Sequence, residues 1–395
     1  MRLELNTANH RTLPHRISNM SESTSNQNHP HGFDFDYDFW FECDCSARTQ
    51  VSASVYEQQC NGERPHPHCA SCDTTIDIAR ANPAVRDPSD IDHQDEAVDR
   101  HYWYHSTYLE DWPSEDSYRQ DVTEMIEKSM LPHWQHQGMI DGKLSIALHL
   151  GTYGAAVENI LRRRCNQDFD GRSYWLHQVE IRLEAADLYP AVRRELDGVI
   201  GDVPLSELVK HENSQAVRYV NTHESAGSIS LAVARTVIAR VRTIALPPPS
   251  TVLPASARAQ KAVEAAFAQL ADAERLRPDT TGIPDNKIPR SVHAVKLAER
   301  RGIIDPRLME VAKKTENYET RHQEIWTELK NGLLDEYLVG VNAQVRSLFD
   351  GACQTVGNPH EFHEQVKGLA VLVCETDSVV RAFEDAKWRK IGHVS

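Results

Sequence analysis

The chain has 395 residues, of which 40% are hydrophobic and 26% charged, a composition that predicts a folded protein of two or three domains. Its formal net charge of -15 gives an acidic surface that repels a phosphate backbone, which argues against general binding of nucleic acid. No apolar run approaches the roughly 20 residues that span a bilayer, and the polar N-terminus has no hydrophobic signal core. We therefore expect a cytoplasmic protein with no membrane partner, in which reduced cysteines bind metal.

The first residues, 1–35, are rich in His, Asn and Ser and contain SESTSNQNHPHG. Such a composition cannot bury enough apolar surface to offset the entropy of chain ordering, so a disordered tail is predicted. The sequence leaves open whether Met1 or Met20 is the true start. The Asp-rich sequence DFDYDF that follows is expected to be solvated charge.

Residues 36–78 are expected to form a small zinc-binding module. FWFECDC and RTQVSASVYEQQC predict a short hairpin flanked by cysteines, in a segment too polar to fold on a hydrophobic core. Its cysteines form a CxC pair, a lone Cys and a CxxC pair, which resembles a zinc ribbon; they are Cys43, Cys45, Cys60, Cys69 and Cys72. Two close thiolate pairs suit tetrahedral Zn²⁺, so the CxC and CxxC pairs are the preferred ligands.

Several features of this zinc module remain open from the sequence. Cys60, His66 or His68 can replace one of the preferred ligands, and the alternative to a metal site is a set of ordinary cysteines. A catalytic zinc normally has an acid or base nearby, and the segment shows none, so the expected role of Zn²⁺ is structural.

A polar linker is expected at 79–98, because ARANPAVRDPSDIDHQDEAVD is rich in Pro and Asp. An α+β domain follows at 99–247, where SIALHL, YWLHQVEIRL, AVRYVN and SISLAV predict strands and YGAAVENILRRR predicts a helix after Thr152. The arginines at the end of this helix are expected to be solvated.

The sequence LPPPSTVLPAS marks a Pro-rich linker at 248–258, since consecutive prolines fit neither a helix nor a central strand. Residues 259–395 are expected to form a helical domain. Apolar residues recur there at helical spacing, as in the sets Val263, Phe267 and Leu270; Ile325, Leu329 and Leu333; Val341, Val345 and Leu348; and Phe362, Val366, Leu369 and Val373. HEFHE at 360–364 lacks the His spacing of a zinc protease and is expected to be a solvated helix start.

A candidate site lies in IALHLGTYGAAVENILRRR, where a strand, a His and a Gly-Thr pair precede an amphipathic helix. Gly151 permits close backbone approach, and Thr152 can cap the helix. A helix N-terminus also favours a phosphate or pyrophosphate. This pattern resembles the ADP-ribosyltransferase fold of poly-ADP-ribose polymerases and tRNA 2′-phosphotransferases, in which a core strand ends in His-Gly-Thr or His-Gly-Ser before a helix.

The resemblance covers about residues 147–247 and implies a split antiparallel sheet and NAD as a substrate. It implies that His149, Gly151 and Thr152 contact the cofactor, although Leu150 interrupts the family's contiguous triplet. The family also places an aromatic residue on a following strand, matched by Tyr174 with Tyr153 as a rival.

The family's glutamate stands near the start of a late strand, and Glu224 precedes SISLAV. A carboxylate there can hold a ribose hydroxyl and stabilise the positive charge that develops as nicotinamide leaves. Each of these residues taken singly has a structural alternative, as a strand-end His, an N-cap, a core aromatic or a loop carboxylate.

A second motif, RHYWYHSTYLEDWP, offers His105, Ser106 and Thr107 as a contiguous His-Ser-Thr group that can belong to the same cleft or replace His149. The alternative is an aromatic packing segment. The chain has no GxGxxG, P-loop or GxSxG sequence, so redox chemistry on dinucleotides, P-loop phosphoryl transfer and α/β-hydrolase chemistry have no motif support.

Two functional hypotheses follow. The first is an NAD-dependent ADP-ribosyltransferase-like enzyme that cleaves the nicotinamide-ribose bond and transfers ADP-ribose to an unknown acceptor, with Glu224 as the catalytic residue. The alternative is a non-catalytic zinc-containing interaction protein whose helical C-terminus binds a protein partner.

Overall fold

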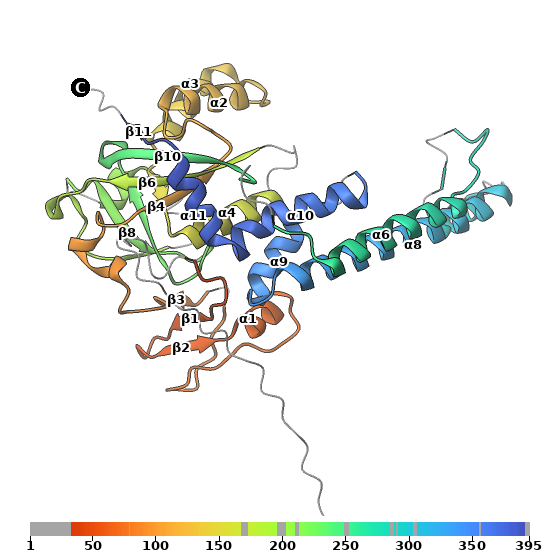
Figure 1. Cartoon of the computed structure of the whole chain (residues 1–395), viewed down its shortest axis with the longest axis horizontal. Helices are drawn as coiled ribbons and strands as arrows, with labels where there is room; N and C mark the ends of the chain where they lie inside the picture. The colour runs from red at the N-terminus through yellow and green to blue at the C-terminus, as the bar shows by residue number, and fades with distance from the viewer. Residues whose placement is uncertain are drawn as a thin grey trace, which may run out of the picture.

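The computed structural model describes residues 33–78, 80–166, 173–195, 203–209, 213–248, 253–284, 288–289, 291–302, 306–354 and 357–391. Most of the expected disordered tail, residues 1–32 with Met20, lies outside the described residues, as do residues 249–252 of the Pro-rich linker. The fold is α+β: an N-terminal hairpin module, a central domain with a split sheet, and a C-terminal helical region (Figure 1).

The N-terminal module is a small sheet with one helix. Its elements are β1 (Phe39–Glu42), β2 (Arg48–Val51), α1 (Ala53–Cys60) and β3 (Asn82–Pro83). β1 and β2 form the expected antiparallel hairpin, and β3 pairs with the other edge of β1. The second half of RTQVSASVYEQQC is helical where a strand was expected, because the Ser52 side chain accepts a hydrogen bond from Val55 N and caps a new helix.

The Asp-rich sequence before β1 is packed, which corrects the expectation of solvated charge. Phe35 and Tyr37 are buried, with 3% and 6% of their surface exposed. Aspartates alternate with aromatic residues here, so the two kinds of side chain point in opposite directions along an extended chain. The Phe33 ring lies 4.7 Å from the ring of Tyr153, centre to centre, at the start of a helix of the central domain.

The central domain has two four-stranded sheets. Its elements are β4 (Trp103–Thr107), α2 (Glu115–Glu127), α3 (His133–Ser145), β5 (Leu148–Leu150), α4 (Tyr153–Asn166), β6 (Tyr174–Ile181), β7 (Arg193–Arg194), α5 (Leu205–Val209), β8 (Ala216–Val220), β9 (Ile229–Val233) and β10 (Ile238–Leu246), with β11 (Arg389–Lys390) added from the C-terminus. The strand orders are β11-β10-β6-β4 and β5-β9-β8-β7, and every pair except β7 with β8 is antiparallel. The four expected strands and the helix after Thr152 are confirmed.

The two sheets meet between β4 and β5. Tyr104 and Gly151 exchange two backbone hydrogen bonds of 2.9 Å there, and the strands diverge on either side of this bridge. α4 begins at the bridge because the Thr152 hydroxyl accepts a hydrogen bond from Ala155 N at 3.2 Å. Its buried face, which includes Val157 and Leu161, anchors the helix across the split.

The C-terminal region is helical, as expected. Its helices are α6 (Ala257–Ala273), α7 (Val292–Glu299), α8 (Pro306–Tyr337), α9 (Ala343–Ala352), α10 (Pro359–Cys374) and α11 (Thr376–Asp385). α6 and α8 lie side by side and form an arm that projects from the molecule, whereas α9, α10 and α11 lie near the central domain (Figure 1). Among the described residues, no helix is long and apolar enough to cross a membrane.

Two details of these helices correct the sequence prediction. Phe267 is 52% exposed although Val263 on the same predicted face is buried, because the arm is two helices thick and its contact face is narrow. The HEFHE segment starts a helix, as expected, but it is solvated on one face only. Asn358 caps α10 there, Phe362 is buried, and the buried His363 ring lies 2.7 Å from the hydroxyl of Tyr337.

Candidate functional site

Four cysteines of the N-terminal module converge on one point. The turn after β1 carries Cys43 and Cys45, and the loop after α1 brings Cys69 and Cys72 beside them. All four sulfur atoms lie within 4.8 Å of one another, with Cys43 Sγ 3.5 Å from Cys72 Sγ and Cys45 Sγ 3.7 Å from Cys69 Sγ.

These distances suit tetrahedral metal coordination. Zinc–sulfur bonds of about 2.3 Å at tetrahedral angles place sulfur atoms roughly 3.8 Å apart. Backbone N–H groups of Cys72 and Ser71 lower the pKa of Cys69 to about 6, and hydrogen bonds with Thr74 lower the pKa of Cys72. The side-chain hydrogen bond with Cys72 raises the pKa of Cys43 and of Cys45, as expected for thiols that share protons at such short distances. The cluster therefore has the donor set and geometry to hold a metal ion such as zinc.

The remaining candidate ligands lie outside this cluster. Cys60 ends α1, and the group of converging ligand atoms found among the described residues comprises only the CxC and CxxC pairs. His66 is exposed, and the His68 ring is 2.8 Å from the backbone oxygen of Asp73. The preferred choice of the two cysteine pairs matches the geometry.

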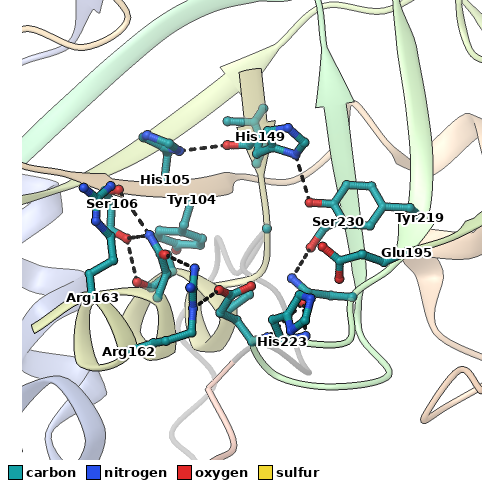
Figure 2. A pocket seen from close by; sticks show the side chains of 17 residues that line it. Tyr104, His105, Ser106, His149, Arg162, Arg163, Glu195, Tyr219, His223 and Ser230 are labelled. Carbon is teal, nitrogen blue, oxygen red and sulfur yellow. Dashed lines mark hydrogen bonds and ion pairs between the residues drawn. The ribbon is translucent and has the colours of Figure 1, made fainter. Parts of the chain in front are cut away.

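A cavity of about 500 Å³ opens at the split between the two sheets (Figure 2). β4 and β5 form one wall of the cavity, and α4 runs along it. The loop that joins β8 to β9 forms another wall. Its lining residues are Tyr104, His105, Ser106, His149, Leu150, Gly151, Ala155, Ala156, Asn159, Arg162, Arg163, Glu195, Tyr219, Asn221, His223, Glu224 and Ser230.

Three of the residues predicted for cofactor binding or catalysis line this cavity together. They are His149 in β5, Gly151 directly after β5, and Glu224 in the β8–β9 loop. The rival residues His105 and Ser106 line it as well, so the two His motifs belong to one cleft.

Thr152 and Tyr174 are not among the lining residues. Thr152 is buried as the cap of α4, and Tyr174 is buried at the start of β6. The rival Tyr153 is also buried, and its hydroxyl donates a hydrogen bond of 2.7 Å to the Leu372 carbonyl in α10. These three side chains support the walls of the cleft rather than facing it.

His105 is held as a neutral side chain. Its Nδ1 lies 2.8 Å from the carbonyl oxygen of His149, which can only accept, so Nδ1 carries the proton and Nε2 is an acceptor. Burial lowers the pKa of His105 to about 3. The Trp112 ring stacks on the imidazole at 4.1 Å between centroids and fixes its plane.

Glu224 is a largely buried carboxylate, with 12% of its side chain exposed, and it has a cationic partner. Its Oε1 accepts a hydrogen bond of 2.7 Å from Arg162 Nε, and the side-chain oxygen of Asn159 accepts another from the same guanidinium at 3.1 Å. Burial raises the pKa of Glu224, and the positive charge of Arg162 opposes this rise. The side-chain oxygen of Asn221 accepts the backbone N–H of Glu224 at 2.9 Å and shapes the loop.

Sequence reasoning missed several polar residues of the cavity. Asn159, Arg162 and Arg163 lie at helical spacing on one face of α4, so the expected solvated helix end instead faces the cleft. Glu195 also lines the cavity, and its Oε2 accepts hydrogen bonds from the backbone and hydroxyl of Thr222 at 2.7 and 2.9 Å. The i, i+3, i+4 pattern after HLGT was a usable signal for the helix residues; nothing local marked Glu195.

No protein-family model, curated protein or solved structure matches this chain in the three comparisons made. The four-cysteine cluster and the cavity at the sheet split are therefore the features from which a function can be inferred.

Proposed function

We propose that the protein is an NAD-using ADP-ribosyltransferase-like enzyme whose active site is the cavity at the sheet split. One observation carries this proposal: His105, His149, Gly151 and Glu224, which come from three separate segments, line the same cavity of about 500 Å³. The volume lies in the usual range of small-molecule sites. The split antiparallel sheet, with His-Ser-Thr in β4, supports the resemblance to the family.

Glu224 is the proposed catalytic residue. When the bond between ribose C1′ and nicotinamide breaks, its electron pair goes to the pyridinium ring, and neutral nicotinamide leaves. The positive charge that grows on the ribose is stabilised by a nearby carboxylate. The acceptor nucleophile then supplies the electron pair of the new bond to C1′ and loses a proton. Glu224 must be ionised for this role, and its ion pair with Arg162 favours that form.

The other lining residues provide recognition. The neutral His105 offers Nε2 as an acceptor for a ribose hydroxyl or a carboxamide N–H. Arg163, on the same face of α4 as Arg162, supplies positive charge for the pyrophosphate of NAD. Gly151 lines the cavity at the end of β5, where the lack of a side chain leaves room for Ala155 and Ser230 to pack against it.

For the cysteine cluster we propose a structural zinc site. Four thiolates leave no open position for a substrate, and a metal cross-link would fix the turn after β1 to the loop after α1, which brings the second cysteine pair. Cys43, Cys45, Cys69 and Cys72 would hold the ion.

The decisive experiment is to incubate the purified protein with NAD and measure nicotinamide release, with NAD binding measured separately by calorimetry. Glu224→Gln should reduce release at least 100-fold and leave NAD binding within a few-fold of wild type. The matched control is Glu180→Gln, because Glu180 also pairs with an arginine, Arg240, but does not line the cavity. Equal release by wild type and Glu224→Gln removes Glu224 from the mechanism, and no NAD binding removes the proposal.

Exposed apolar side chains on the C-terminal helices favour a second candidate function. Phe267 on α6 and Leu297 on α7 are 52% and 42% exposed, and an apolar helical surface can bind a protein partner. If wild-type protein leaves NAD untouched and a specific partner is lost in Phe267→Ser, the interaction hypothesis is selected instead.

A further inference from the structure

A buried carboxylate joins the N-terminal module to the loop that carries Glu224. Glu158, on the inner face of α4, is 2% exposed. Its two oxygens accept hydrogen bonds of 2.9 and 3.0 Å from the hydroxyl of Tyr37. Its Oε2 also accepts the backbone N–H of Ser225 at 2.7 Å. Ser225 is the residue after Glu224, so one carboxylate holds two distant segments together.

The same loop is held from a second side. Arg86 follows β3 and donates a hydrogen bond of 3.1 Å to the Ser225 hydroxyl. Its backbone N–H donates to the Gly227 carbonyl at 2.8 Å, and its guanidinium lies 4.2 Å from the centre of the Tyr37 ring. A side chain at Gly227 would place its Cβ 2.9 Å from the carbonyl oxygen of Ala84, so loop and module are in close contact.

The backbone of this loop needs such support. Ser225 has a φ of 48° and Gly227 a φ of 83°, and the left-handed region is unfavourable for a serine. Ser225 is 2% exposed, so its backbone N–H needs an acceptor inside the protein, and Glu158 Oε2 provides that acceptor in this conformation.

We infer that Glu158 is a positioning residue for Glu224 and that Tyr37 makes this positioning depend on the N-terminal module. Neither Tyr37 nor Glu158 lines the cavity, so both act through Ser225 and not on a bound ligand. The module is then part of the site's framework. The effect of this coupling on catalysis rests on the proposed function. The coupling itself, in which Tyr37 and Glu158 hold the loop at Ser225, does not depend on that function.

The coupling can be tested without any activity, by hydrogen exchange of the full chain followed in peptides that cover residues 221–228. Tyr37→Phe removes the hydroxyl bonded to Glu158, and Glu158→Gln replaces the carboxylate by a neutral acceptor. Both variants should raise the exchange rate in this loop about five-fold, because the hydrogen bond from Ser225 N is weakened. The matched control is Tyr318→Phe, which likewise removes a tyrosine hydroxyl that donates to a carboxylate, here Glu274 Oε1 at 2.7 Å, but lies in α8 and not beside the loop. It should leave exchange in the loop unchanged.

The kinetic arm separates positioning from a general structural effect. In nicotinamide release, Tyr37→Phe should lower kcat about ten-fold with KM for NAD nearly unchanged, because the lining residues that bind the ligand are intact. Unchanged loop exchange in folded Tyr37→Phe protein overturns the inference, and Tyr37→Phe decides alone if Glu158→Gln does not fold. If wild type binds no NAD, the proposed function fails, while the exchange result still decides the coupling.

Discussion

Arg162 and Glu224, which are 62 residues apart in the chain, meet in an ion pair of 2.7 Å at the wall of the cavity. The arginine comes from α4 and the glutamate from the loop between β8 and β9, so the pair links the helix at the sheet split to this loop. Burial and Arg162 have opposite effects on the pKa of Glu224, and the pair thereby sets the pH range in which the carboxylate is ionised.

Replacing Arg162 by an uncharged residue should raise the pH above which Glu224 is ionised. In Arg162→Gln the carboxylate keeps its burial but loses its cation, so the pKa of Glu224 should rise. The acidic limb of the pH profile for nicotinamide release should then shift to higher pH. Arg162→Lys should restore part of the shift.

Arg119→Gln provides the control for this pH shift, because Arg119 pairs with Glu115 on the surface of α2. It should leave the profile where it is. A profile of Arg162→Gln that coincides with wild type would show that Glu224 does not govern the acidic limb.

Zinc analysis tests the cysteine cluster. Purified protein should contain one zinc per chain, and Cys69→Ser should lose it, because three remaining thiolates do not close a tetrahedral site. We expect the free energy of unfolding to fall by a few kcal/mol, since metal binding and folding are coupled in so small a module. Cys60→Ser should keep both the metal and the stability, because Cys60 lies outside the converging group. Metal loss in both variants alike would assign Cys60 to the site.

Burial of Glu158 predicts a dependence of stability on pH. Burial raises the pKa of Glu158 from 4.5 to about 7, so between these values the folded protein binds more protons than the unfolded chain. The contribution of this group to stability is greatest below pH 4.5 and falls as pH rises to about 7. The fall is on the order of 3 kcal/mol for a shift of this size.

The measurement compares urea unfolding of wild type and Glu158→Gln at several pH values. Glutamine does not titrate, so the stability of wild type relative to this variant should decline from pH 4.5 to about 7 and then level off. A constant difference across this range would show that Glu158 keeps an ordinary pKa.

The sequence predicted the elements that depend on local pattern. Alternating or continuous apolar runs located β6, β8 and β9, and the cap at Thr152 located α4. The cysteine pairs were found for the same reason, since each pair lies within a few residues. The helix α1 was not predicted. The alternating pattern before Ser52 was taken to continue as a strand, although Ser52 caps the helix that begins at the next residue.

Contacts between distant segments could not be predicted in this way. Tyr37 lies in a sequence that was expected to be solvated. Its hydroxyl is nevertheless buried, because it donates a hydrogen bond to Glu158, which is 121 residues away in the chain. Arg162 appeared to be a solvated helix end because its partner Glu224 is brought to it only by the sheet topology. The packing of distant segments determines which candidate polar residues face the cavity. The order of the motifs along the chain is not sufficient to identify these residues.

Substitution of Gly151 tests how closely α4 and β9 pack against the end of β5 at the sheet split. A Cβ at this position would lie 2.9 Å from the Cβ of Ala155 and 3.2 Å from the hydroxyl of Ser230, so it would push α4 and β9 away from β5. Gly151→Ala should therefore destabilise the protein by about 1–3 kcal/mol and weaken NAD binding, because the two backbone bonds to Tyr104 would be strained.

Gly142→Ala is the matched control for this substitution. Gly142 lies inside α3, where an added Cβ would meet no neighbouring atom within 4 Å, so alanine should stabilise the helix by about 0.5–1 kcal/mol. Thermal unfolding of the two variants should therefore shift in opposite directions. An unchanged or raised unfolding temperature of Gly151→Ala would mean that β5 and α4 separate without cost, and the sheet split would then be looser than the bridge between Tyr104 and Gly151 implies.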